Sequence, residues 1–185
     1  MGEPGTKDLL SLEQLEAAGG LRTGRKHTLS ILVENKPGVL TRIAGLFARR
    51  GFNIDTLAVG PTDDESVSRI TLTVDGAKHP IDQVTKQLHK LVNVLKIRDL
   101  EPLDAVSREL ALFKVAADGP ARGEVMQIAN IFRGNVVDVS RRALVIEITG
   151  TDEKIVAFEQ LVRPFGLIEM VRTGEIAISR GRGET

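Results

Sequence analysis

The chain has 185 residues, with 25 Lys and Arg against 25 Asp and Glu, so its formal net charge at pH 7 is zero. This length fits one ordinary domain or two small ones, and the balanced charge provides no net field for nucleic acid or an anionic membrane. Six Phe and no Trp or Tyr leave little aromatic surface for stacking bases. The absence of Cys excludes disulfides, thiolate zinc sites and Cys nucleophiles, and three His argue against a histidine metal site.

The N-terminal segment, residues 1–26, is predicted to be a flexible arm. Leu9, Leu10, Leu12 and Leu15 could line a short helix, but an isolated helix of this length is marginal in water. Its alternative role is a docking segment for another subunit. The acidic residues and the lack of an apolar core segment argue against a signal peptide, and no apolar run could span a membrane. We therefore predict a cytoplasmic protein.

The first half, from Thr28, shows a regular pattern of six elements. The order strand, helix, strand, strand, helix, strand is the ferredoxin-like βαββαβ arrangement, with both helices on one face of the sheet. The other face is then free to pair with something else. The first elements are a strand over 29–33 and a helix with Val39, Leu40, Ile43, Ala44 and Phe47 at apolar spacing. A strand over 54–59 and a turn over 60–65 follow, and the next strand alternates Ile70, Leu72 and Val74 with Arg69, Thr71 and Thr73. The last elements are a helix after Pro80, with Ile81, Val84, Leu88 and Leu91 on its inner side, and a strand over 94–97.

The second half repeats this order after a boundary at residues 101–104. We therefore predict an α+β protein with two ferredoxin-like βαββαβ domains in tandem. The predicted elements are a strand over 110–115, a helix with Val125, Ile128, Ala129 and Phe132 that ends at Gly134, strands over 136–139 and 144–148, a helix capped by Thr151 and Asp152 and stopped by Pro164, a core strand over 168–171 and an edge strand over 176–178.

The first strand–helix loop is the best candidate for a binding site. Pro37 suits a helix start, and Gly38 lets the backbone approach a ligand closely. The free N–H groups of the first helical turn would favour a carboxylate. Asn35 and Asn53 each offer a donor and an acceptor, which suits the polar head of an amino acid. This pattern indicates a sensor of a small amino acid, although ordinary turn chemistry would also explain it.

Other polar clusters have simpler explanations. Asp63, Asp64 and Glu65 suit a solvated hairpin turn, and Arg49 and Arg50 suit a helix C-terminus. No nucleophile has a base nearby, and no acid–base pair stands out. We therefore predict no catalytic residue and no metal ligand, which argues against a small hydrolase on this fold.

Several stretches resemble the small, regulatory subunit of acetolactate synthase (acetohydroxyacid synthase). The resemblance extends from about His27 to Gly181. It rests on the stretches Glu34–Leu40, Gly45–Ile54, Pro61–Asp64, Lys86–Leu91, Ile131–Gly134 and Ser179–Gly181.

This resemblance implies a valine-sensing ACT domain over residues 27–101, a linker over 102–107 and a second ferredoxin-like domain over 108–185. It also implies a non-catalytic subunit that activates a catalytic subunit and confers feedback inhibition by valine. The cofactors, namely thiamine diphosphate, Mg²⁺ and FAD, would be bound by that partner and not by this chain. The alternative is a free-standing ACT module that regulates another enzyme or a transcription factor.

The resemblance further implies a homodimer through the ACT domains, with valine at their interface. The N–H groups near Gly38 and Val39 would bind the carboxylate, and Asn35 the ammonium. Leu40 and its neighbours, including Pro37, would surround the isopropyl group. Asn53 and Ile54 of the second chain would complete the pocket.

Overall fold

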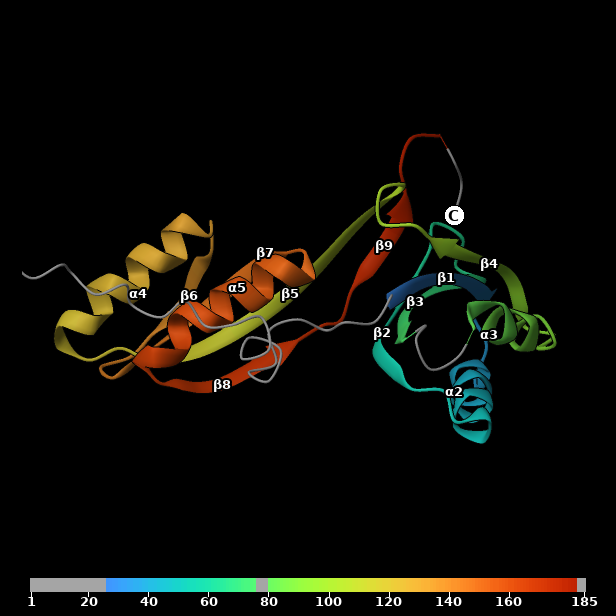
Figure 1. Cartoon of the computed structure of the whole chain (residues 1–185), viewed down its shortest axis with the longest axis horizontal. Helices are drawn as coiled ribbons and strands as arrows, with labels where there is room; N and C mark the ends of the chain where they lie inside the picture. Colours follow the sequence, from blue (N-terminus) through green and yellow to red (C-terminus); the bar gives the residue numbers. More distant parts are fainter. Residues whose placement is uncertain (1–25, 76–79, 183–185) are drawn as a thin grey trace, which may run out of the picture.

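The computed structural model describes residues 26–75 and 80–182 and contains the two predicted units (Figure 1). The first sheet has the strand order β2-β3-β1-β4, and the second has β6-β7-β5-β8. Both are the ferredoxin-like order, so the predicted α+β fold is confirmed. The first unit comprises β1 (Lys26–Glu34), α2 (Val39–Arg50), β2 (Ile54–Pro61), β3 (Val67–Asp75), α3 (Ile81–Leu88) and β4 (Val94–Leu100). The second comprises β5 (Ala105–Ala116), α4 (Gly119–Ile131), β6 (Asn135–Val139), β7 (Ala143–Gly150), α5 (Asp152–Val162), a 3₁₀ turn (Arg163–Phe165), β8 (Leu167–Arg172) and β9 (Ile176–Ser179).

The first core lies between the sheet and helices α2 and α3. Alternate residues of β1 and β3 point into it, as period-two strands require. Within α2 the buried residues are Val39, Ile43, Leu46 and Phe47, whereas Leu40 and Ala44 are exposed. The prediction that these two residues face the core is wrong. Each residue of a helix is rotated by about 100° from the one before it, which turns Leu40 and Ala44 away from the side on which Val39 and Ile43 are buried.

Helix α3 is shorter than predicted and ends at Leu88. His89 follows as its exposed C-cap, and Leu91 packs against the core from the turn beyond. The second core is equivalent, with Phe113, Phe132 and Phe158 in edge-to-face contacts. Thr151 occupies the N-cap position of α5, but no side chain forms a capping hydrogen bond there, contrary to the prediction.

Strand β8 lies at the edge of the second sheet, not in its core as predicted. Ile168 and Val171 are more than half exposed. The strand has only one neighbour, β5, so its apolar side chains are covered from one side alone.

No helix in the described part of the chain is long and apolar enough to cross a membrane.

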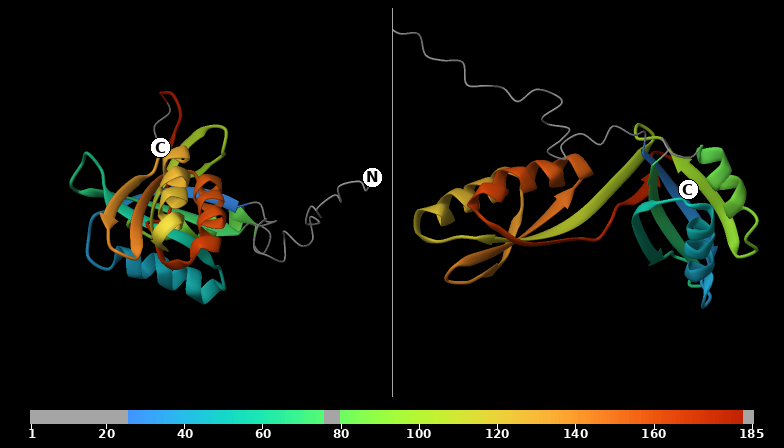
Figure 2. Two further views of the ribbon diagram at one scale, coloured as in Figure 1. Left: turned by 90° about the vertical axis from the view of Figure 1, so that its left-hand side faces the viewer. Right: turned by 60° about the horizontal axis from the view of Figure 1, so that its bottom comes forward.

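A two-stranded ribbon joins the halves. Strand β5 is long, and its first residues pair with β9 through the register Ala105↔Ser179 to Arg108↔Ile176. Figures 1 and 2 show this ribbon reaching the first sheet, where β9 contacts β1, β3 and β4. Leu100, Ala105 and Ala177 form a small buried cluster there. The sheet face predicted to be free is thus partly covered by the chain's own C-terminal strand.

The ribbon also bears on the predicted linker. Residues 105–107 belong to β5, so strand structure begins before residue 108. The domain bounds stay a prediction, since a strand that crosses a boundary does not define it. The predicted arm lies outside the described residues up to residue 25, and Lys26 already belongs to β1.

Candidate functional site

The loop between β1 and α2 has the backbone geometry that the sequence indicated. Gly38 is the N-cap of α2, with φ 82° and ψ −4°. This left-handed conformation favours glycine. No side chain caps the helix, and the N–H of Val39 makes only a long 3.4 Å bond to the Lys36 carbonyl. The first turn therefore presents N–H groups that no side chain satisfies.

A polar network anchors the start of this loop. The Asn93 side-chain amide donates to Glu34 Oε2 at 2.5 Å, and Arg42 Nη1 donates to Asn93 Oδ1 at 2.6 Å. Lys36 Nζ lies 3.2 Å from the other oxygen of Glu34. Asn93 first, and then Lys36, hold the pKa of the Glu34 carboxyl below its usual value. Glu34 is therefore ionised at neutral pH and fixes the entry of the chain into the loop.

Asn35 is held by the β2–β3 turn. Its backbone N–H donates to the Ser66 carbonyl at 2.7 Å, and its Nδ2 donates to the Glu65 carbonyl at 2.9 Å. Asp64 accepts bonds from the hydroxyl and N–H of Ser66, which lower the pKa of its carboxyl. Asp64 thus has the structural role that its place in a hairpin turn suggested.

Asn53 and Ile54 do not meet this loop within one chain. They follow the C-terminus of α2, whose 12 residues span about 18 Å. Asn53 Nδ2 instead donates to Asp55 Oδ1 at 2.8 Å. Of the loop residues, Pro37, Gly38 and Leu40 are exposed, whereas the side chain of Val39 is buried in the core. Only the backbone of Val39 is therefore available to a ligand.

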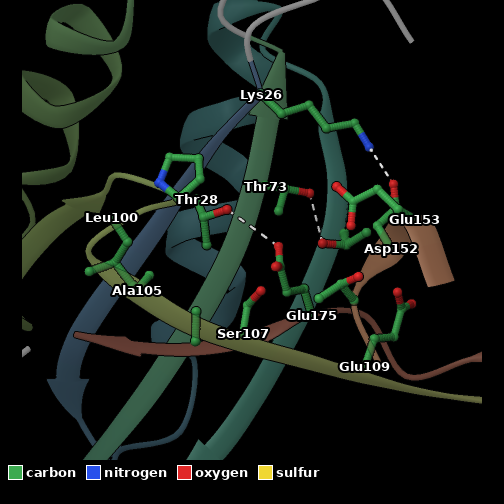
Figure 3. A pocket seen from close by; sticks show the side chains of 14 residues that line it. Lys26, Thr28, Thr73, Leu100, Ala105, Ser107, Glu109, Asp152, Glu153 and Glu175 are labelled. Atoms are coloured by element: carbon green, nitrogen blue, oxygen red, sulfur yellow. Dashed lines mark hydrogen bonds and ion pairs between the residues drawn. The ribbon is translucent and has the colours of Figure 1, made fainter. Parts of the chain in front are cut away.

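A cavity of about 310 Å³ with several charged residues in its lining lies between the two halves (Figure 3). Arg172 donates to both oxygens of Glu109, through Nε at 2.8 Å and through Nη2, and Nη2 also donates to Asp152 at 2.5 Å. Lys26 Nζ of β1 lies 3.5 Å from the second oxygen of Asp152. Glu175 accepts a bond from the Thr28 hydroxyl at 3.3 Å. These pairs tie the first strand of the chain to the second domain.

The charges of this junction compensate one another. The contact with Glu109 raises the pKa of Arg172. Burial alone would raise the pKa of Asp152, but the hydrogen bond from Arg172 and the charge of Lys26 outweigh it, so this pKa is lowered. Sequence reasoning missed the junction because its paired residues are up to 147 positions apart. No sequence motif connects them.

No group of three or more His, Asp or Glu within residues 26–75 and 80–182 is placed to hold a metal ion. Three acidic residues of the cavity, Glu109, Asp152 and Glu175, are engaged with cations and a hydroxyl instead.

Comparisons with known proteins agree with the architecture. A family model for the ACT domain of acetohydroxyacid synthase small subunits matches residues 29–96, and a model for the small subunit of acetolactate synthase matches residues 108–181. The acetolactate synthase small subunit of Mycolicibacterium smegmatis is 52% identical over 155 residues, which are 84% of this chain and 91% of that protein. The chain belongs to the acetolactate synthase small-subunit family.

Two further relatives extend the assignment of this small subunit. A probable acetolactate synthase small subunit of Methanothermobacter thermautotrophicus is 52% identical over 84% of this chain and 93% of its own length. The crystal structure of the small subunit from Thermotoga maritima is similar, with a TM-score of 0.79 and 43% identity over 86% of this chain and 99% of that one. The first half is thus an ACT domain, and the expected family is confirmed.

Proposed function

We propose that this small subunit activates the catalytic subunit of acetolactate synthase and makes it sensitive to valine. The catalytic subunit would carry thiamine diphosphate, Mg²⁺ and FAD, and this chain would carry no catalytic centre of its own. The observation that supports the valine site best is the uncapped start of α2 behind Gly38. There, backbone N–H groups and the positive end of the helix dipole favour a carboxylate.

The space in front of Gly38 is open. A Cβ added there would meet no atom within 4 Å, so the backbone is accessible to a ligand. The amide of Asn35 donates to the Glu65 carbonyl, and its Oδ1 has no hydrogen bond within the described residues. That oxygen could accept a bond from the valine ammonium. Backbone donors for the carboxylate and an acceptor for the ammonium would then lie side by side, as an amino acid requires.

Pairing of two chains would explain how Asn53 and Ile54 reach the same ligand. Strands β1 and β2 both run antiparallel to β3, so both end near the 35–40 loop. Strand β2 is an edge of its sheet. If two β2 edges pair antiparallel about a two-fold axis, the start of one lies beside the end of the other. This pairing would bring Ile54 of the second chain to the loop.

Exposed apolar side chains on α2 and on the edge strand β2 support an interface. Leu40 is 42% exposed and Val59 is 49% exposed. Val59 lies opposite Ile70 of β3 and therefore faces the same side of the sheet as α2. The exposed pair suits both a second chain and the isopropyl group of valine.

Inhibition would be a shift between two arrangements of the holoenzyme. Valine can inhibit only if it binds the less active arrangement more tightly. A tenfold preference corresponds to about 1.4 kcal/mol, which one charge-assisted hydrogen bond could supply.

Gly38→Asp is expected to abolish the valine response, because it places a carboxylate beside that of the ligand. The measurement is acetolactate formation by catalytic subunit plus small subunit against valine concentration, together with the thermal shift of the small subunit alone. Wild type is expected to increase the activity, to form no acetolactate by itself and to gain thermal stability with valine, since a ligand of the folded state stabilises it.

Gly38→Asn is the matched control. Asn has nearly the same size as Asp and must adopt the same left-handed backbone at this position, but it carries no charge. The variant is expected to keep a measurable valine response. Undiminished inhibition in Gly38→Asp would show that the site is elsewhere, whereas loss in both variants would assign the effect to the loop conformation.

A further inference from the structure

The C-terminus of α4 has an unusual backbone. The N–H of Arg133 donates to the Asn130 carbonyl at 3.0 Å, and that of Gly134 to the Ala129 carbonyl at 2.8 Å. These bonds form a Schellman motif in which Arg133 takes the left-handed position that glycine usually occupies. With φ 53°, Arg133 is the one described non-glycine residue with positive φ. Its side chain makes this conformation costly.

The neighbouring glycine does not explain this arrangement. Gly134 lies against β7, where an added Cβ would overlap Ile148 Cδ1 and lie 3.1 Å from the Glu147 carbonyl oxygen. Glycine is therefore required at 134 for packing, one residue after the strained position. Strain of this kind is found preferentially where a side chain serves a function.

The surface around Arg133 combines exposed apolar area with cations. A shallow depression of about 420 Å³ is lined by Ile131, Phe132, Arg133 and Lys154. Ile131 is 76% exposed. Lys154, from α5, donates to the Thr149 carbonyl at 2.7 Å. Neither cation has a carboxylate within 4 Å among residues 26–75 and 80–182. Figure 1 shows α4 and α5 side by side over the second sheet.

We propose that this α4 corner, defined as Ile131, Phe132, Arg133 and Lys154, binds the catalytic subunit. The occupant would be an apolar side chain of that subunit, flanked by a carboxylate that pairs with Arg133 and Lys154. Buried apolar anchors and Arg are the residues that carry most binding energy at interfaces. The inference rests on the proposed function, because it requires a complex with the catalytic subunit.

Charge favours this partner over a second copy of the chain. A two-fold contact would place the same patch on both sides. Arg133 and Lys154 would then face identical cations without any carboxylate in the patch, which is repulsive. A partner with an acidic side chain beside an apolar one has no such conflict.

The test uses the holoenzyme reconstituted from this chain and its catalytic subunit. Arg133→Gly is expected to raise the Tm of the isolated small subunit, because it relieves the left-handed strain. The same change is expected to raise the small-subunit concentration for half-maximal activation at least tenfold. Ile131→Ser is expected to weaken activation without raising the Tm. A variant that is more stable but activates less well distinguishes a docking role of Arg133 from a structural one.

Arg141→Gly is the matched control, since Arg141 is an exposed cation at the opposite end of β6. It is expected to leave activation unchanged. Activation by Arg133→Gly within twofold of wild type, or a lower Tm in that variant, would overturn the proposal. A third outcome would also overturn the proposal. If Ile131→Ser changed the oligomeric state of the isolated small subunit, measured by sedimentation, the corner would be assigned to a contact between copies of this chain. Failure of wild type to bind or activate the catalytic subunit would overturn the proposed function as well.

Discussion

Two glycines of the second domain show how different the demands on one residue type can be. Gly134 is enclosed by β7, with Ile148 and the Glu147 carbonyl at the position of an added Cβ. Gly123 lies within α4, where a Cβ would meet nothing within 4 Å. The first glycine is required by packing, and the second is not.

Gly134→Ala is expected to lower the free energy of unfolding by about 1–3 kcal/mol, because the added methyl group overpacks the site. Gly123→Ala is the control and is expected to raise it by about 0.5–1 kcal/mol through helix propensity. Urea unfolding of both variants measures the difference. Equal effects of the two substitutions would contradict the packing described at Gly134.

At the scale of elements, β9 determines how the two halves contact each other. It pairs with the first four residues of β5 and lies across the open face of the first sheet. Ala177 is buried there against Leu100 and Ala105, whereas the neighbouring Ile178 is 54% exposed. A small residue is needed at 177 because the ribbon and β4 approach closely.

Ala177→Glu is expected to detach the ribbon from the first sheet, since burying an unpaired carboxylate costs more than losing the contact. Hydrogen exchange of the β9 and early β5 amides is expected to become faster, while the amides of both cores stay protected. Ile178→Glu adds the same charge at an exposed position and is expected to leave exchange nearly unchanged. Full protection of β9 in Ala177→Glu would show that the cluster does not hold the ribbon.

At the scale of the whole molecule, the halves are joined by charge as well as by the ribbon. Lys26 at the start of β1 pairs with Asp152 of α5, which also accepts from Arg172. The pKa of Asp152 is lower in the folded chain than its ordinary value of 3.8. This depressed pKa contributes stability above pH 3.8, and the contribution is lost as the pH falls through the folded pKa.

Asp152→Asn is therefore expected to lower stability at pH 7, and the difference from wild type is expected to shrink below pH 3.8. The effect should be on the order of 1 kcal/mol or less, because Asp152 is partly exposed and solvent screens the pair. Glu153→Gln, an exposed neighbour in the same helical turn, serves as the control. Urea midpoints at pH 7, 4 and 3 measure both variants, and a difference that grows on acidification would contradict the assignment.

Much of the loop between β1 and α2 could be predicted from local chemistry. Pro37 and Gly38 at a helix start, with Asn35 before them, indicated the open turn that the structure contains. The prediction for Asn53 and Ile54 needed a second chain, since they lie at the other end of α2. Valine binding itself stays a prediction.

The sequence by itself determined the element order and the tandem ferredoxin-like fold, because periodicity and turn residues act over a few positions. Only the tertiary structure decided that β9 covers the first sheet and that Glu109, Asp152 and Arg172 meet Lys26. It also decided that Arg133 takes a position suited to glycine. These contacts join residues far apart in the chain, and such pairings depend on how whole sheets and helices pack, which no local pattern encodes.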